Sequence, residues 1–228
     1  MKEVVVISLG GSLIIPEEPN AGFLIKFVKT LRKNYKKNKF VIVCGGGPLA
    51  RKYIEALKLE GKSKKELSIV GIKATRTNAS FVMQLFGKEA NGVLPKNMKE
   101  IKDNLVKNNL VICGALRFTP NSTSDTTAAK LANYLKTYFI NMTNVKGLYT
   151  DNPKTNKKAK FISKITLKEF EKKALKIKHK PGQHFVLDQK AATIIRKNKI
   201  RTYIIGKDPE NLNKLLNKKS FIGTTIKK

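Results

Sequence analysis

The chain has 228 residues, and 41% of them are hydrophobic, which is enough to form the core of one α/β domain spanning residues 1–228. No stretch reaches the roughly 20 apolar residues that a membrane span needs. The apolar start, Val4–Leu9, is too short for a signal peptide. A membrane protein is therefore excluded, and the cytoplasm is the expected location. Cys44 and Cys113 each end an apolar run before a glycine, which favours buried thiols over a disulfide.

Short apolar runs alternate with amphipathic segments along the chain, and a charged loop is expected at Lys154–Phe161. This alternation predicts an α/β fold, a three-layer α/β/α sandwich with a mostly parallel central sheet. The predicted strands are Val4–Leu9, Phe40–Cys44, Leu110–Cys113, Tyr138–Met142 and Arg201–Ile205, with Gly223–Ile226 as an edge strand. The predicted helices are Ala21–Lys37, Pro48–Leu59, Leu67–Phe86, Met98–Lys107, Thr126–Leu135, Ile165–Leu175, Val186–Lys197 and Pro209–Leu216.

Three consecutive glycines, Gly45–Gly47, separate the second strand from its helix. Glycine leaves the backbone N–H groups accessible, and the helix start favours an anion. Arg51 on the first turn adds a clamp for phosphate, so we interpret this turn as a phosphate site. Two other readings stay open: a turn that serves packing alone, and a dinucleotide fingerprint, which is weakened because the next apolar run ends in Lys73 and not in an acidic residue. A P-loop at Gly61 is rejected, because Ala56 stands where glycine is required.

A long loop rich in serine, threonine and proline follows the third strand and ends at Asp125, where a helix begins. Its hydroxyls and the free N–H groups of the helix start favour an anion or sugar hydroxyls. An ordinary cap by Ser124 or Asp125 is the alternative. Ligands of parallel sheets bind at the carboxyl ends of strands. We therefore expect the loops at Gly10, Gly45, Gly114 and Thr143 to converge on one crevice.

The charge is strongly positive, with 47 Lys and Arg against 16 Asp and Glu, a net charge of +31. Such a field attracts phosphates, nucleotides and nucleic acids. The lysines are scattered, however, and no aromatic-interleaved recognition segment accompanies them, so no specific nucleic acid partner is expected. The charge agrees with an anionic substrate, although a bias in overall composition is its simpler explanation.

Seven motifs together resemble the amino acid kinase family, and within it the archaeal-type uridylate kinases. They cover nearly the whole chain: Ser8–Ser12, Cys44–Glu55, Gly71–Ala79, Ser124–Ala129, Thr143–Pro153, Val186–Ile195 and Gly223–Ile226. The resemblance implies transfer of the γ-phosphoryl group of Mg-ATP to UMP, giving UDP and ADP. It also implies Mg²⁺ as a cofactor carried by ATP, no metal site of the protein's own, and a homo-oligomer, typically a hexamer.

The resemblance also implies roles for individual residues. The catalytic group would be Gly10, Gly11, Ser12, Arg51 and Asp125. UMP would contact Gly46, Ser68, Ala115, Leu116, Arg117, Phe118, Thr119, Pro120, Asn121, Ser122 and Thr123. ATP would contact Ser8, Leu9, Gly10, Gly11, Ser12, Gly47, Arg51, Thr143, Asn144, Tyr149, Asp151 and Asn152.

Ser8 stands where the family usually has a lysine, and Lys52 and Lys190 are candidates to replace that charge. Two alternatives therefore stay beside the kinase hypothesis. One is a sister kinase for another small phosphate or carboxylate acceptor. The other is a degenerate kinase that binds nucleotide or RNA without turnover.

Overall fold

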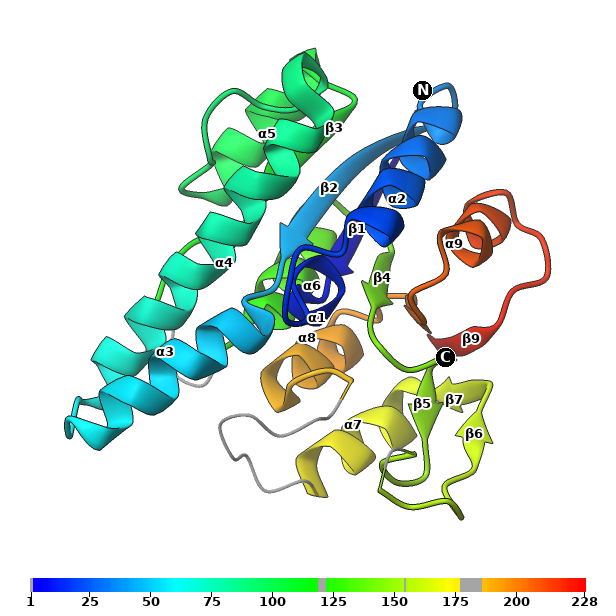
Figure 1. The fold of residues 1–228 in the computed structure, drawn as a ribbon. Coiled ribbons are helices and arrows are strands. Elements are labelled where there is room, and N and C mark those ends of the chain that lie inside the picture. Colours follow the sequence, from blue (N-terminus) through cyan, green and yellow to red (C-terminus); the bar gives the residue numbers. More distant parts are fainter. Residues whose placement is uncertain (1, 119–121, 154, 177–185) are drawn as a thin grey trace.

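A computed structural model describes residues 2–118, 122–153, 155–176 and 186–228. Its centre is a seven-stranded sheet in the order β3-β2-β1-β4-β8-β9-β7 (Figure 1). The first five strands in this order are parallel, β9 runs antiparallel to β8, and β7 is parallel to β9. The strands are β1 (Glu3–Leu9), β2 (Asn38–Cys44), β3 (Leu110–Cys113), β4 (Phe139–Met142), β7 (Lys164–Thr166), β8 (Thr202–Ile205) and β9 (Gly223–Lys227). A second small sheet pairs β5 (Leu148–Tyr149) with β6 (Phe161–Ile162).

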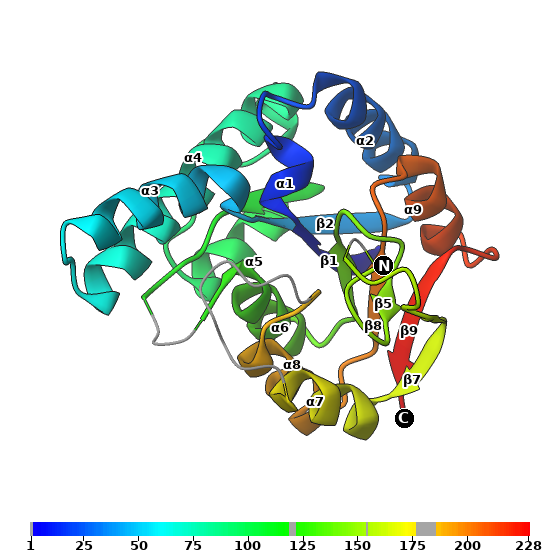
Figure 2. The ribbon, with the colours of Figure 1, turned by 60° about the horizontal axis from the view of Figure 1, so that its bottom comes forward.

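Helices cover both faces of the sheet, as Figure 2 shows, and this confirms the predicted layered α/β architecture. Alternate strand residues enter opposite cores: Ile7 packs with α2 and α4, whereas Val6 packs with α6 and α8. One face carries α1 (Gly11–Ile14), α2 (Ala21–Asn34), α4 (Lys64–Phe86) and α9 (Pro209–Leu216). The other carries α5 (Met98–Lys107), α6 (Ser124–Tyr134), α7 (Leu167–Lys176) and α8 (Gln189–Lys197). Helix α3 (Gly47–Leu59) packs against α4 and buries no residue completely.

The last third of the chain departs from the sequence prediction. Gly223–Ile226 is not an edge strand, because β9 lies between β8 and β7. The helix predicted over Ile165–Leu175 begins only at Leu167, since Ile165 pairs with Ile226 in the sheet. Strands β5, β6 and β7 have only two or three residues each, too few to produce a periodic pattern.

Two helices start at other residues than the sequence predicts, because side-chain caps set their first turns. Ser63 and Glu66 form a reciprocal capping box, so α4 starts at Lys64 and not at Leu67. Helix α8 starts at Gln189, after the cap Asp188, and not at Val186. Helix α6 is capped by Thr123, whose hydroxyl accepts the N–H of Asp125. The two predicted caps, Ser124 and Asp125, lie inside the helix. Cys44 and Cys113 are buried free thiols, as predicted. In the described part of the chain, no helix is long and apolar enough to span a membrane.

Candidate active site

The carboxyl ends of the parallel strands meet at one cavity of about 1000 Å³. Leu9 lies opposite Cys44 of β2 and Met142 of β4, so the three strands end level with one another. The Gly45 N–H donates to the Leu9 carbonyl (2.9 Å), and the Gly10 N–H donates to the Met142 carbonyl (3.1 Å). The expected convergence of four loops is confirmed: Gly10, Gly45, Ala115 and Thr143 all line the cavity, with Ala115 standing for the loop that opens at Gly114.

Two glycine turns touch each other across the cavity floor. A Cβ atom at Gly11 would lie 2.3 Å from the Gly47 nitrogen, so no side chain fits between the turns. Gly47 itself has φ +57°, a left-handed conformation that favours glycine, and a Cβ atom there would lie 2.4 Å from the Gly11 carbonyl carbon. Glycine at both positions is therefore required for main chain to meet main chain.

Several backbone donors of these two turns are left without a partner among the described residues. Within the described residues, no hydrogen bond is donated by the N–H groups of Gly11, Ser12, Gly46 or Gly47. The last two begin helix α3, whose dipole favours an anion at this end. Arg51, on the first turn of α3, lines the same cavity. Two adjacent sets of free donors with a guanidinium beside them suit two phosphate groups placed end to end.

Asp125, at the start of α6, lines the same cavity. The buried Ser8 hydroxyl of β1 donates to its Oδ1 atom (2.7 Å). Burial, with a smaller contribution from the nearby charge of Asp188, raises the pKa of the Asp125 carboxyl to about 7, while the Ser8 hydrogen bond acts in the opposite direction. Ser8 thus binds Asp125 at the position where the resemblance implies a lysine.

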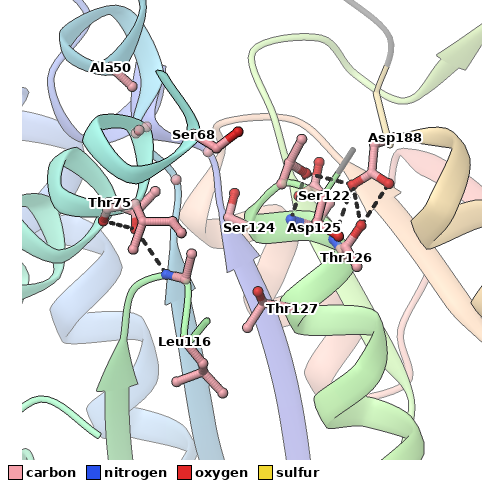
Figure 3. Close-up of a pocket in the computed structure, with 18 of the residues that line it drawn as sticks. Ala50, Ser68, Thr75, Leu116, Ser122, Ser124, Asp125, Thr126, Thr127 and Asp188 are labelled. Carbon is pink, nitrogen blue, oxygen red and sulfur yellow. Dashed lines mark hydrogen bonds between the residues drawn. The ribbon is translucent and has the colours of Figure 1, made fainter. Parts of the chain in front are cut away.

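Asp188 joins the starts of α6 and α8 (Figure 3). Its carboxylate accepts hydrogen bonds from the Thr126 N–H (3.1 Å) and hydroxyl (2.8 Å), from the Thr123 hydroxyl (2.6 Å) and from the Ala191 N–H (2.7 Å). Sequence reasoning gave this residue no role, although an aspartate directly before a helix is a recognisable cap signal. The sequence pattern also gave no sign of Lys64 and Lys130, which line the cavity. The two lysines predicted to replace the missing charge, Lys52 and Lys190, are not among its described lining residues.

The loop after β3 is held by α4. The Ala115 N–H donates to the Thr75 hydroxyl (2.9 Å), and the Arg76 guanidinium donates to the carbonyls of Ala115 (3.3 Å) and Leu116 (2.8 Å). Ser68 of α4 faces the cavity from this side (Figure 3). The predicted residues Ala115, Leu116, Arg117, Phe118, Ser122 and Thr123 line the cavity, whereas Thr119, Pro120 and Asn121 lie outside the described residues.

The residues expected around adenosine are only partly gathered at the cavity. Thr143 lines it, but Asn144, Tyr149, Asp151 and Asn152 are not among its described lining residues. The Tyr149 ring packs on Phe161 at a centroid distance of 5.4 Å. Asp151 accepts the N–H of Asn152 (2.7 Å) and the side-chain amide of Asn156 (2.8 Å), and these bonds lower the pKa of its carboxyl. Their contact with a nucleotide stays a prediction.

The fold and the cavity define an α/β protein that is built to bring two anionic ligands together at the ends of parallel strands. The chain belongs to the amino acid kinase family, whose model matches residues 3–206.

Relatives and solved structures agree with this assignment. The chain is 33% identical to a uridylate kinase of Thermococcus kodakarensis over 89% of this chain and 90% of that protein. It is 34% identical to a uridylate kinase of Archaeoglobus fulgidus over 97% and 99%. The crystal structure of uridylate kinase from Archaeoglobus fulgidus matches with a TM-score of 0.84 at 33% identity, covering 99% of this chain and 100% of that one. A UMP kinase structure from Bacillus anthracis shares the fold, with a TM-score of 0.80 at 18% identity.

Proposed function

We propose that this chain is a uridylate kinase, which transfers the γ-phosphoryl group of ATP to UMP and releases UDP and ADP. The observation that carries the proposal is the contact between the Gly11 and Gly47 turns, with unpaired N–H groups on both sides of it. The named relatives, at 33% and 34% identity over most of the chain, support UMP as the acceptor.

The glycine turns and Arg51 supply alignment and charge. In-line phosphoryl transfer asks little covalent chemistry of the protein, because most of the barrier is lowered by positioning and by stabilising charge on the transferred group. The N–H groups of Gly11 and Ser12 would hold the phosphates of ATP, while the Gly10 N–H stays bonded to the Met142 carbonyl and fixes the turn. Those of Gly46 and Gly47, together with Arg51, would hold the facing phosphates. Two anions repel each other, and these fixed donors offset that repulsion without reorganising.

UMP would occupy the side of the cavity between α4 and the loop after β3. Ala115 and Leu116 are fixed there by hydrogen bonds to Thr75 and Arg76, which gives the base a preformed wall. Ser68 would face the ribose. Asp125 would organise the charged groups around the transferred phosphoryl group, with Ser8 fixing its carboxylate.

Magnesium would arrive with ATP. The described residues contain no cluster of three or more His, Cys, Asp or Glu that could hold a metal ion, and the Asp188 carboxylate already accepts hydrogen bonds from both helix starts. This donor set fits a cation held mainly by phosphate oxygens and water, with Asp125 as the carboxylate beside it. When bound, Mg²⁺ supplies charge neutralisation between the phosphates.

A homo-oligomer, a hexamer by family resemblance, and a cytoplasmic location are further parts of the proposal. Helices α3 and α4 expose large apolar side chains, with Leu59 89% and Tyr53 49% accessible, and this agrees with a face that a second copy covers. Light scattering on the purified protein measures its mass. A monomer at micromolar concentration would exclude this part.

The function is tested with purified protein, ATP and Mg²⁺ against UMP, CMP, AMP, GMP and a panel of small phosphate and carboxylate acceptors, with ADP release as the readout. UMP-dependent ADP release that disappears with EDTA is expected. Preference for another acceptor would indicate a sister kinase. ATP or RNA binding without turnover on any acceptor would indicate a degenerate kinase.

A further inference from the structure

We propose that Asn78 of α4 is a positioning residue for phosphoryl transfer, which holds the Gly45–Gly47 turn so that its N–H groups face the phosphates. This inference rests on the proposed kinase function. Asn78 lies within the Gly71–Ala79 motif. Neither the composition nor the family resemblance predicts a role for this residue. Its side-chain amide donates to the carbonyl of Gly45 (2.7 Å) and to that of Gly46 (3.3 Å).

The peptide geometry converts these two bonds into an orientation of the donors. In a trans peptide the C=O and the following N–H point in opposite directions within one plane. Asn78 pulls the carbonyls of Gly45 and Gly46 toward α4, so the N–H groups of Gly46 and Gly47 point away from it. The Gly47 nitrogen accordingly lies beside Gly11, at the contact between the two turns. Glycine has no side chain to restrict its dihedral angles. The Gly46 carbonyl also accepts the Ala50 N–H of α3 (3.2 Å), so the shorter bond from Asn78 to the Gly45 carbonyl is its main contribution.

The burial of Asn78 indicates a role beyond stabilising the fold. The residue is completely buried, and its Oδ1 atom has no hydrogen-bond partner among the residues that the structure describes. A buried polar atom without a partner is unfavourable, because its desolvation is not offset by a hydrogen bond. An apolar residue of similar size would avoid that cost but could not hold the glycine carbonyls. Unsatisfied polar groups of this kind are expected at functional sites.

Asn211 of α9 offers a matched control. It is also nearly buried, and its side chain holds a loop backbone, donating to the Ile222 carbonyl (2.7 Å) and accepting the Ile222 N–H (2.8 Å). Neither asparagine is among the described residues that line the cavity, but Asn78 bonds a turn that does, whereas Ile222 lies outside it. Asn78→Ala and Asn211→Ala therefore remove the same group from similar surroundings, and only the first lies beside the glycine turn.

The test compares kcat and KM for UMP, ADP affinity by calorimetry, and thermal unfolding in both variants. We expect Asn78→Ala to lower kcat at least about tenfold, corresponding to about 1.4 kcal/mol of transition-state stabilisation, and to weaken ADP binding. Asn211→Ala should lose comparable thermal stability and keep kcat within about twofold, as expected for a contact remote from the reacting groups.

A kcat of Asn78→Ala within about twofold of the parent, or an equal loss in Asn211→Ala, would overturn the proposal, because either result means that Asn78 acts on stability alone. If Asn78→Ala does not fold, Asn78→Ser leaves a smaller cavity and is read by the same criteria. Failure of the kinase assignment is recognised separately, since the parent protein would then not phosphorylate UMP, while ADP affinity would still report on the turn.

Discussion

Substituting Arg51 should change the activity of this protein without changing its stability. It lies on the first turn of α3, lines the cavity, and forms no hydrogen bond or ion pair with the described residues. Replacing it by alanine therefore removes no contact that holds the fold, and unfolding should change by less than about 0.5 kcal/mol. Hydrogen bonds to charged groups contribute about 1.5–3 kcal/mol, so losing the contact with a transferring phosphate corresponds to a fall of about 10- to 150-fold in kcat/KM.

The assay is steady-state ADP release with UMP as the varied substrate, beside thermal unfolding of the same samples. Arg51→Lys keeps the charge but loses the planar fork, so an intermediate loss is expected. Arg201→Ala is the control, because this exposed arginine lies outside the cavity and should leave kcat/KM unchanged. If Arg51→Ala retains more than half of the parent activity at moderate salt, the phosphate role of this cavity is wrong. A protein that binds RNA through diffuse charge would show that pattern, with steep salt dependence of binding.

Three further predictions concern the groups around the same cavity. Gly47→Ala should lower activity at least about tenfold, whereas Gly61→Ala, also left-handed at φ +66° but with nothing within 4 Å of a Cβ atom, should cost stability alone, about 1–2 kcal/mol. Equal activity in the two variants would contradict the contact between the glycine turns. The pKa of the Asp125 carboxyl is raised from 3.8 to about 7. Between these two pH values the folded state keeps a proton that the unfolded state has lost. The free energy of unfolding therefore falls as the pH rises through this window. Asp125→Asn should consequently gain more in thermal stability over the parent at pH 8 than at pH 5, and an equal gain at both would disprove the shift. Thr75→Val should raise the KM for UMP about fivefold, and Thr75→Ser, which keeps the hydroxyl that accepts the Ala115 N–H, should not; equal KM values would refute this positioning.

Much of the fold could be predicted because the signals are local. The buried strands from Val4 to Leu9 and from Phe40 to Cys44 are apolar runs that end at glycines, and both are found in the sheet. Since parallel strands end at the same edge, their following loops could be placed together without coordinates. The same rule predicts that Arg51 and Asp125 lie at one site, and both line the cavity.

What could not be predicted depends on contacts between distant segments. The Asp188 carboxylate binds Thr123 and Thr126, which lie more than sixty positions earlier in the chain. The sequence around Asp188 does not indicate these partners. The hydrogen bonds from Asn78 to the glycine carbonyls likewise join an amphipathic helix to a turn on another element. Strands as short as β7 acquire their conformation from β9, which comes some sixty residues later. Local pattern carries no information about such pairs.

The position of β9 has a practical consequence for handling this protein. Residues 223–227 pair with β8 on one side and, among the described strands, provide the only partner of β7 in the sheet. The Thr224 hydroxyl of β9 also accepts the Leu148 N–H (2.7 Å) and donates to the Ile162 carbonyl (2.5 Å), and so ties the two-stranded β5-β6 sheet to the main one. Deleting residues 223–228 would therefore detach two pieces of structure at once, β7 and the β5-β6 sheet.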